Sequence, residues 1–187
     1  MIRPASISEF GIVWDIDLDA SVLFERAGLC TDFKDDHEFS VSERTRYLAS
    51  LSAGETLLAM APSGEPVGFA ALGTLDGEPY LDQLSVRVSH MQRGLGTALI
   101  EAVVRLAASS GARTLWLTTY AHLPWNKPFY ERRGFETIPA TEWAPEIAGQ
   151  ISLQRKWLPF PDERVVMRRK LPLTPPYSWR AEFQSIV

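Results

Sequence analysis

The sequence lacks the features that stabilise a small secreted protein or hold a protein in a membrane. It has a single cysteine, Cys30, so no disulfide can form within the chain. No apolar run approaches the ~18 residues that a membrane-spanning helix needs. The first residues have no apolar stretch of the kind found in a signal peptide. These absences favour a cytoplasmic protein in a reducing compartment, without a membrane partner.

An excess of positive charge is also missing. The chain has 19 Lys and Arg residues against 23 Asp and Glu residues, which argues against a general nucleic-acid-binding protein. Its three histidines and one cysteine do not have the spacing of metal ligands, so no metal site is expected. A hydrophobic content of 45% excludes a mostly disordered chain, and 187 residues suit one domain. We expect that domain over residues 1–170, followed by a proline-rich tail over 171–187.

The spacing of apolar residues and the positions of glycine and proline predict an α/β chain of the α+β type. Helices are predicted over residues 6–27, 41–53, 94–110, 126–133 and 142–156. Strands are predicted over residues 2–3, 56–61, 67–75, 80–88, 114–119, 135–138 and 165–169. Antiparallel hairpins therefore come first and a strand–helix–strand crossover follows, which predicts a mixed sheet flanked by helices.

A glycine-containing loop, residues 92–97, joins a predicted strand to the long central helix. Its glycines, Gly94 and Gly96, allow a ligand to approach the backbone, and free N–H groups at a helix start bind phosphate. Arg93 adds a full positive charge. The third glycine of a dinucleotide-binding loop would fall at Leu99, and no Gly-Lys-Ser/Thr follows, so neither an oxidoreductase nor a P-loop enzyme is indicated. A plain strand-to-helix turn is the alternative.

This segment resembles the signature of the GNAT superfamily of acyl-CoA-dependent N-acyltransferases, Gln/Arg-x-x-Gly-x-Gly/Ala, with Met91 in place of the first Gln or Arg. Residues 126–135 are similar to a second family segment, which contains an Asn, a Tyr and a Gly-Phe pair. The resemblance implies the GNAT fold, with a mixed, mostly antiparallel sheet of about six or seven strands. It also implies transfer of an acetyl group from acetyl-CoA to a primary amine by direct attack, without a metal. A non-catalytic acyl-CoA-binding module of the same fold is the alternative.

The resemblance also implies a site for the donor. Loop backbone amides would hold the diphosphate, and one strand would pair with the pantetheine arm and splay from the strand at 114–119. Tyr130 matches the acid that protonates the leaving thiolate, although it could instead fill the core. Asn126 matches a contact to the cofactor arm, although it could instead cap a short helix. The predicted cofactor contacts are Leu84, Val86, Val88, Gln92, Arg93, Gly94, Leu95, Gly96, Thr97, Asn126 and Phe129.

Asp82 is the predicted general base. Strand alternation places it on the same face as Leu84 and Val86, where apolar surroundings would raise its pKa. Two alternatives stay open: a carboxylate near the strand start that reaches solvent, and a β-bulge that reverses the face.

Asp17 lies among the apolar residues of the first helix, with Asp19 on the opposite side. The resemblance implies that this helix lines the acceptor pocket, so Asp17 is the predicted anchor for a cationic amine. The alternative for Asp17 is a carboxylate that bonds other groups of the chain. Trp14 and Trp125 are predicted to border the acceptor, with aromatic core as the alternative for Trp125. The acceptor is an amine of unknown identity. The proline-rich tail and the habit of the family are compatible with a homodimer.

Overall fold

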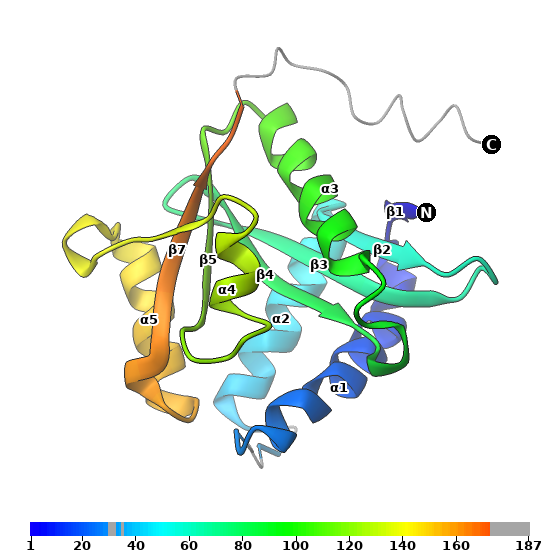
Figure 1. Ribbon diagram of the computed structural model, residues 1–187, viewed down its shortest axis with the longest axis horizontal. Coiled ribbons are helices and arrows are strands. Elements are labelled where there is room, and N and C mark those ends of the chain that lie inside the picture. Colours follow the sequence, from blue (N-terminus) through cyan, green and yellow to red (C-terminus); the bar gives the residue numbers. More distant parts are fainter. Residues whose placement is uncertain (30–32, 35, 173–187) are drawn as a thin grey trace.

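The computed structural model describes residues 1–29, 33–34 and 36–172. Cys30 and the tail from residue 173 lie outside these residues. A seven-stranded sheet runs through the molecule in the order β1-β2-β3-β4-β5-β7-β6 (Figure 1). Every neighbouring pair is antiparallel except β4 and β5, which are parallel. The predicted mixed, mostly antiparallel sheet is therefore confirmed. The strands are β1 (Ile2–Pro4), β2 (Thr56–Met60), β3 (Pro66–Leu75), β4 (Glu78–Val86), β5 (Thr114–Tyr120), β6 (Glu136–Thr137) and β7 (Arg164–Lys170).

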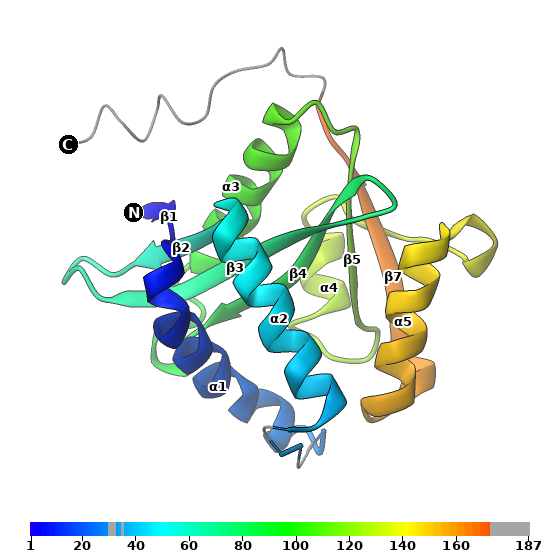
Figure 2. The same cartoon turned by 180° about the vertical axis from the view of Figure 1, so that it is seen from behind.

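Helices cover both faces of this sheet. They are α1 (Phe10–Arg26), α2 (Glu38–Ala53), α3 (Leu95–Ser109), α4 (Lys127–Glu131) and α5 (Pro145–Trp157). Helices α3 and α4 lie on one face (Figure 1), and α1, α2 and α5 lie on the other (Figure 2). No helix in the described ranges 1–29, 33–34 and 36–172 is both long and apolar enough to span a membrane.

Strand alternation explains how one sheet supports two cores. Leu57 and Ala59 of β2 pack in the cluster formed with α3, whereas Leu58 and Met60 pack in the cluster formed with α1 and α2. All of β2 is buried, because it lies inside the sheet between β1 and β3.

The central helix fits its prediction closely. Residues 95–109 are helical, against a predicted range of 94–110. Leu99 and Val103 are fully buried against the sheet, as their four-residue spacing requires. The apolar face of α3 thus fixes the helix directly after the glycine loop.

Three boundaries differ from prediction in ways that bear on the site. Strand β4 ends at Val86, and residues 88–90 form a 3-10 turn instead of the predicted strand end. The predicted helix over 126–133 shortens to α4, with Pro128 in its first turn. Helix α5 begins at Pro145 and not at Glu142, because residues 140–142 form a separate 3-10 turn.

Candidate active site

The parallel strands β4 and β5 separate soon after they meet. They pair only at Tyr80–Trp116 and Leu81–Leu117, and then diverge (Figure 1). From Asp82 to Val86, the edge of β4 that faces β5 has no strand partner within the described part of the chain. The predicted splay is therefore present, and it leaves backbone groups free to pair with an extended ligand.

A β-bulge lies where the divergence begins. Leu81 is opposite Leu72 of β3 and Gln83 is opposite Ala71, so Asp82 is an extra residue with no partner of its own. A bulge bends its strand and increases the local twist. The bend in β4 gives a physical reason for its separation from β5.

The glycine loop presents unused backbone donors. Gln92 and Gly94 have φ angles of 60° and 82°, and Gly94 begins α3 without a side-chain cap. The first hydrogen bond of the helix runs from Ala98 N–H to Gly94 C=O at 3.0 Å. Among the described residues, the N–H groups from Gln92 to Thr97 find no acceptor. Donors in this arrangement, at a helix start, fit a diphosphate.

Gly96 has a packing role of its own. A Cβ at this position would lie 3.3 Å from the ring of Phe129. The glycine therefore lets α4 pack directly against the first turn of α3. Arg133 completes this junction, because its guanidinium stacks 3.6 Å from the Phe129 ring centroid and donates to the hydroxyl of Thr97. The sequence did not indicate Arg133.

Tyr130 lies in the same junction, with its ring packed against Phe129 and Phe135. Its hydroxyl forms no hydrogen bond within the described residues. Burial raises the pKa of the Tyr130 hydroxyl, so the phenol keeps its proton at neutral pH. The ring packs in the core, as the alternative interpretation expected, and the free hydroxyl also permits the acid role.

Asn126 stands before α4 but does not cap it with its side chain. Its backbone carbonyl accepts the N–H groups of Phe129 and Tyr130 instead, at 2.8 and 3.1 Å. The capping interpretation of the side chain is therefore wrong, and the amide stays available for another contact.

Asp82 does not lie where strand alternation predicted. The bulge turns its side chain toward α2, whereas Leu84 and Val86 pack on the α3 side. Its carboxylate is 5% exposed and accepts from Nε of Arg46 at 2.9 and 3.0 Å. Burial raises the pKa of Asp82, and the charge of Arg46 opposes that rise. The expectation of an apolar neighbourhood is wrong, and so is the alternative of a solvent-exposed charge.

Asp17 points inward, as predicted, but it already has partners. It accepts hydrogen bonds from the Tyr47 hydroxyl at 2.9 Å and from Gln83 and Ser85, both at 2.7 Å. Burial raises the pKa of Asp17, and these three donors oppose the rise. The carboxylate thus bonds other groups of the chain, as the alternative interpretation expected.

The prediction for Val88 is wrong in its geometry. Val88 lies beyond the end of β4, and its N–H donates to the Asp19 carboxylate at 2.7 Å. From its angle around the helix alone, Asp19 was expected on the side opposite Asp17. The available strand edge therefore stops at Val86.

Glu43 and Arg46 were not found from the sequence. Both lie on α2, which has a polar composition and no motif. Glu43 has no hydrogen-bond or ion-pair partner among the described residues. Burial raises the pKa of Glu43 to about 8, with a further contribution from the charges of Asp17 and Asp82. Glu43, Asp17 and Asp82 thus form an acidic group on the α1–α2 side of the sheet.

The two predicted tryptophans occupy different places. Trp14 contacts Tyr47, which bonds Asp17, so it borders the acidic group. Trp125 packs against Phe24 in a separate small cluster, and its buried indole N–H has no hydrogen-bond partner among the described residues. The aromatic-core interpretation fits Trp125.

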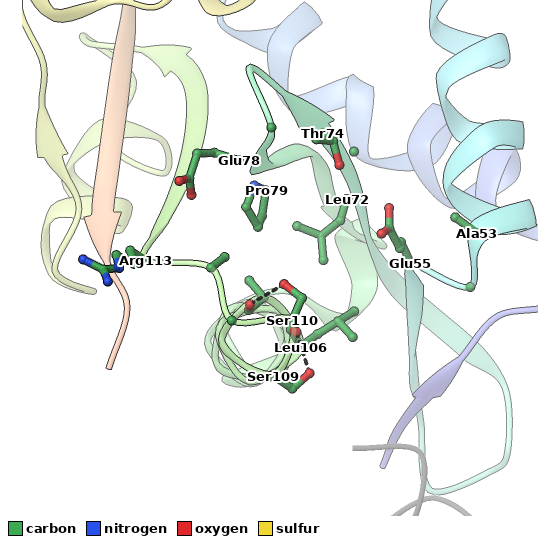
Figure 3. Close-up of a pocket in the computed structure, with 16 residues that line it drawn as sticks. Ala53, Glu55, Leu72, Thr74, Glu78, Pro79, Leu106, Ser109, Ser110 and Arg113 are labelled. Atoms are coloured by element: carbon green, nitrogen blue, oxygen red, sulfur yellow. Dashed lines mark hydrogen bonds between the residues drawn. The ribbon is translucent and has the colours of Figure 1, made fainter. Parts of the chain in front are cut away.

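Two hollows lie near these elements. One, of about 510 Å³, adjoins the glycine loop and is lined by Thr97, Glu101, Arg132, Arg133, Gly134 and Arg169. Its arginines suit the anionic end of a nucleotide-bearing ligand. The other, of about 580 Å³, lies between the ends of α2 and α3 and the β3–β4 turn (Figure 3). None of the predicted site residues lines this second hollow.

Solved structures share this fold. The PaiA N-acetyltransferase of Thermoplasma acidophilum, in complex with coenzyme A, aligns with a TM-score of 0.64 at 15% identity, over 91% of this chain and 98% of its own. A GNAT-family acetyltransferase of Staphylococcus aureus aligns with a TM-score of 0.67 at 20% identity, over 92% and 99%. The ribosomal-protein-S18-alanine N-acetyltransferase of Escherichia coli gives a TM-score of 0.60 at 17% identity, over 96% and 98%.

The sequence itself matches a family model. Residues 25–135 match the model described as the acetyltransferase (GNAT) family. The matched range holds the diverging strand, the glycine loop and Tyr130, and it spans more than half of the 187 residues. The chain therefore belongs to the acetyltransferase (GNAT) family.

Proposed function

We propose that this protein transfers an acetyl group from acetyl-CoA to a primary amine by direct attack of the amine. The observation that carries the proposal is the placement of three features around one end of β4. These features are the unpaired amides of the glycine loop, the unpaired edge of β4 and the free hydroxyl of Tyr130. Each meets one need of the transfer.

The donor would be held by groups on the α3 side. Amides from Gln92 to Thr97 would bind the diphosphate, and the edge of β4 up to Val86 would pair with the pantetheine arm. The arginine-lined hollow beside Thr97 would accept the remaining anionic end of the coenzyme. Asn126 and Phe129 lie at the start of α4, next to this path.

The acceptor would approach from the α1–α2 side. The amine nitrogen attacks the thioester carbonyl carbon, the carbon–sulfur bond breaks, and the thiolate takes the proton of Tyr130. A free alkyl amine has a pKa of ~10 and arrives protonated, so it must lose one proton before it attacks and a second as the amide forms. The first proton would pass through the acidic group to solvent, and the second would restore the phenol of Tyr130. The acidic group formed by Asp17, Glu43 and Asp82 suits both a cation and its proton.

Two of these carboxylates compete for the role of base. Asp82, the base expected from the sequence, forms an ion pair with Arg46. Glu43 has no partner in the described chain and titrates near pH 8, close to the value that an efficient base requires. We propose that the proton leaves through this pair, with Asp82 on the strand and Glu43, which has no partner among the described residues, as the proton acceptor.

Thiol release from acetyl-CoA across a broad amine panel tests the proposal. Calorimetry with coenzyme A runs beside it. An acyl-CoA-binding module without turnover would give heat with coenzyme A and no thiol with any amine. A protein that gives neither heat nor thiol would contradict the donor site itself.

A further inference from the structure

Arg164, the first residue of β7, is a buried cation without a carboxylate partner among the described residues. The residue is 6% exposed. Its Nη2 donates to the Gln154 side-chain carbonyl at 2.6 Å and to the Thr118 hydroxyl at 3.2 Å, and both acceptors are neutral. No Asp or Glu of the described chain lies within ion-pair distance of it, and its Nε is buried with no hydrogen-bond partner.

This environment is unusual for a guanidinium. Arginine stays protonated in proteins, and a buried charge is costly unless an opposite charge or a full set of hydrogen bonds compensates it. Elsewhere in the chain, the partly buried Arg46 has Asp82 and the half-exposed Arg3 has Glu9. For Arg164, the described structure adds a contact with the ring of Tyr120, 4.6 Å from its guanidinium carbon.

Arg164 also lies at the end of the sheet where the strands diverge. It is opposite Tyr120, the last residue of β5, and the strands β4 and β5 have diverged before that point. A chain of side chains leads from it to the candidate site. Thr118 donates to Gln154 at 2.7 Å, and the Tyr80 hydroxyl lies 2.7 Å from Thr118.

Tyr80 links Arg164 to the acidic group formed by Asp17, Glu43 and Asp82. Its hydroxyl contacts Thr118, which accepts from Arg164, and the charges of Asp82, Arg46 and Arg164 all act on it. Tyr130 is within reach of Arg164 as well. The α1–α2–α5 face of the diverging strands therefore has a carboxylate flank and a cationic flank, with Tyr80 between them.

We propose that Arg164 binds a carboxylate of the acceptor, so that the acceptor is an amine that carries a carboxylate, of the amino-acid type. The inference rests on the proposed acetyl transfer. A guanidinium and a carboxylate match in charge and in planar geometry. The acidic group would then take the ammonium end of the same molecule, next to the acetyl donor.

The test compares matched acceptors that differ in one charge. Thiol release from acetyl-CoA is measured with free amino acids, both α and ω, and with the corresponding amino-acid amides, which keep the amine and lose the negative charge. We expect the wild-type protein to favour the preferred amino acid over its amide by about 100-fold or more in kcat/KM, because a buried polar group left unpaired rejects the analogue.

Variants assign that preference to one residue. Arg164→Gln should lower kcat/KM for the amino acid by about 100-fold, mainly through KM, and change kcat/KM for the amide by less than about threefold. Arg168→Gln is the matched control. It removes a guanidinium four residues along the same strand, where Glu136 and Glu142 already pair it at 3.4 and 3.6 Å, and both acceptors should be unaffected. Heat with coenzyme A reports that each variant is folded.

The outcomes separate this inference from the function on which it rests. Equal use of amino acid and amide by the wild type would overturn the inference and leave acetyl transfer in place. Equal losses for both acceptors in Arg164→Gln would assign a structural role and also overturn it. Heat with coenzyme A but no thiol with any carboxylate-bearing amine would count against it as well. If Arg164→Gln does not fold, two other measurements still test the inference. One is the wild-type comparison of amino acid with amide, and the other is the same comparison in Arg164→Lys, which keeps the charge but loses the planar guanidinium. Absence of both heat and thiol with every amine would reject the acetyltransferase proposal itself.

Discussion

Arg46 of α2 holds Asp82 at the bulge of β4. Its Nε donates to both carboxylate oxygens, at 3.0 and 2.9 Å, across 36 residues of sequence. Nη1 of the same guanidinium donates to Ser42 at 2.8 Å. This contact holds α2 against β4 at the point where β4 diverges from β5. Its loss would therefore affect both the stability of the fold and the geometry of the candidate site.

Loss of this ion pair should destabilise the protein. Arg46→Gln leaves a 5%-exposed carboxylate without its counter-charge, and we expect a loss of about 3 kcal/mol in the free energy of unfolding. Urea denaturation measures this change in the free energy of unfolding. Lys156→Gln is the control, because its pair with Glu38 is more than half exposed on both sides and should change stability by less than about 0.5 kcal/mol. Equal effects of the two substitutions would contradict the buried role of Arg46.

The pH profile should identify the proton acceptor. If Glu43 accepts the proton, kcat/KM rises with pH through a limb near pH 8, because the carboxylate must be ionised to act. Glu43→Gln should remove that limb and lower kcat/KM by about 100-fold. Asp82→Asn should lower the rate but keep the limb. If the limb near pH 8 persists in Glu43→Gln, Asp82 and not Glu43 would be assigned as the base.

Glu43 should also make stability depend on pH. Its pKa is about 8 in the folded protein against an ordinary value of 4.5, so the folded state binds a proton that the unfolded chain has released. The wild type should therefore lose stability relative to Glu43→Gln as the pH rises from about 4.5 to 8, and the difference should level off above that range. Thermal unfolding of both proteins across this pH range measures whether the difference in stability falls or rises with pH. A wild type that gains stability relative to the variant would show that the pKa is lowered.

Tyr130→Phe tests the acid. The substitution removes a hydroxyl that has no hydrogen-bond partner in the described residues, so the free energy of unfolding should stay within about 0.5 kcal/mol. Turnover should fall by about 100-fold, while the affinity for coenzyme A changes little. Tyr120→Phe is the control, because its hydroxyl bonds the carbonyl of Pro159 at 2.8 Å and serves structure. Full turnover by Tyr130→Phe would remove the hydroxyl from the mechanism.

Gly94 allows charge and backbone strain to be separated. Its φ of 82° favours glycine and tolerates asparagine, and a Cβ there meets no atom within 4 Å. Gly94→Asn should therefore weaken coenzyme A binding only modestly. Gly94→Asp, of nearly the same shape, adds a negative charge beside the proposed diphosphate site and should weaken binding by a further factor of about ten or more. Calorimetry at two salt concentrations measures both. Identical affinities in the two variants would contradict the phosphate assignment.

The features of the proposed donor side could be predicted because they are local in sequence. Gly94, Gly96 and the start of α3 are contiguous, and the apolar spacing of that helix fixes where its free N–H groups point. Tyr130 follows from a second short segment. The sheet order could also be anticipated, since hairpins pair neighbouring strands and the crossover pairs β4 with β5.

The sequence by itself therefore determined the fold class, the glycine loop and the family. Tertiary structure alone decided the arrangement of charges on the α1–α2–α5 face of the sheet. One extra residue in β4 turned Asp82 from the α3 face to the α2 face, because side chains alternate with a period of two and a single bulge reverses them. Glu43 and Arg46 come from α2, a helix without a motif, and Arg164 comes from β7. Their charges acquire meaning only from burial and from neighbours that are distant in sequence, and no local pattern encodes either.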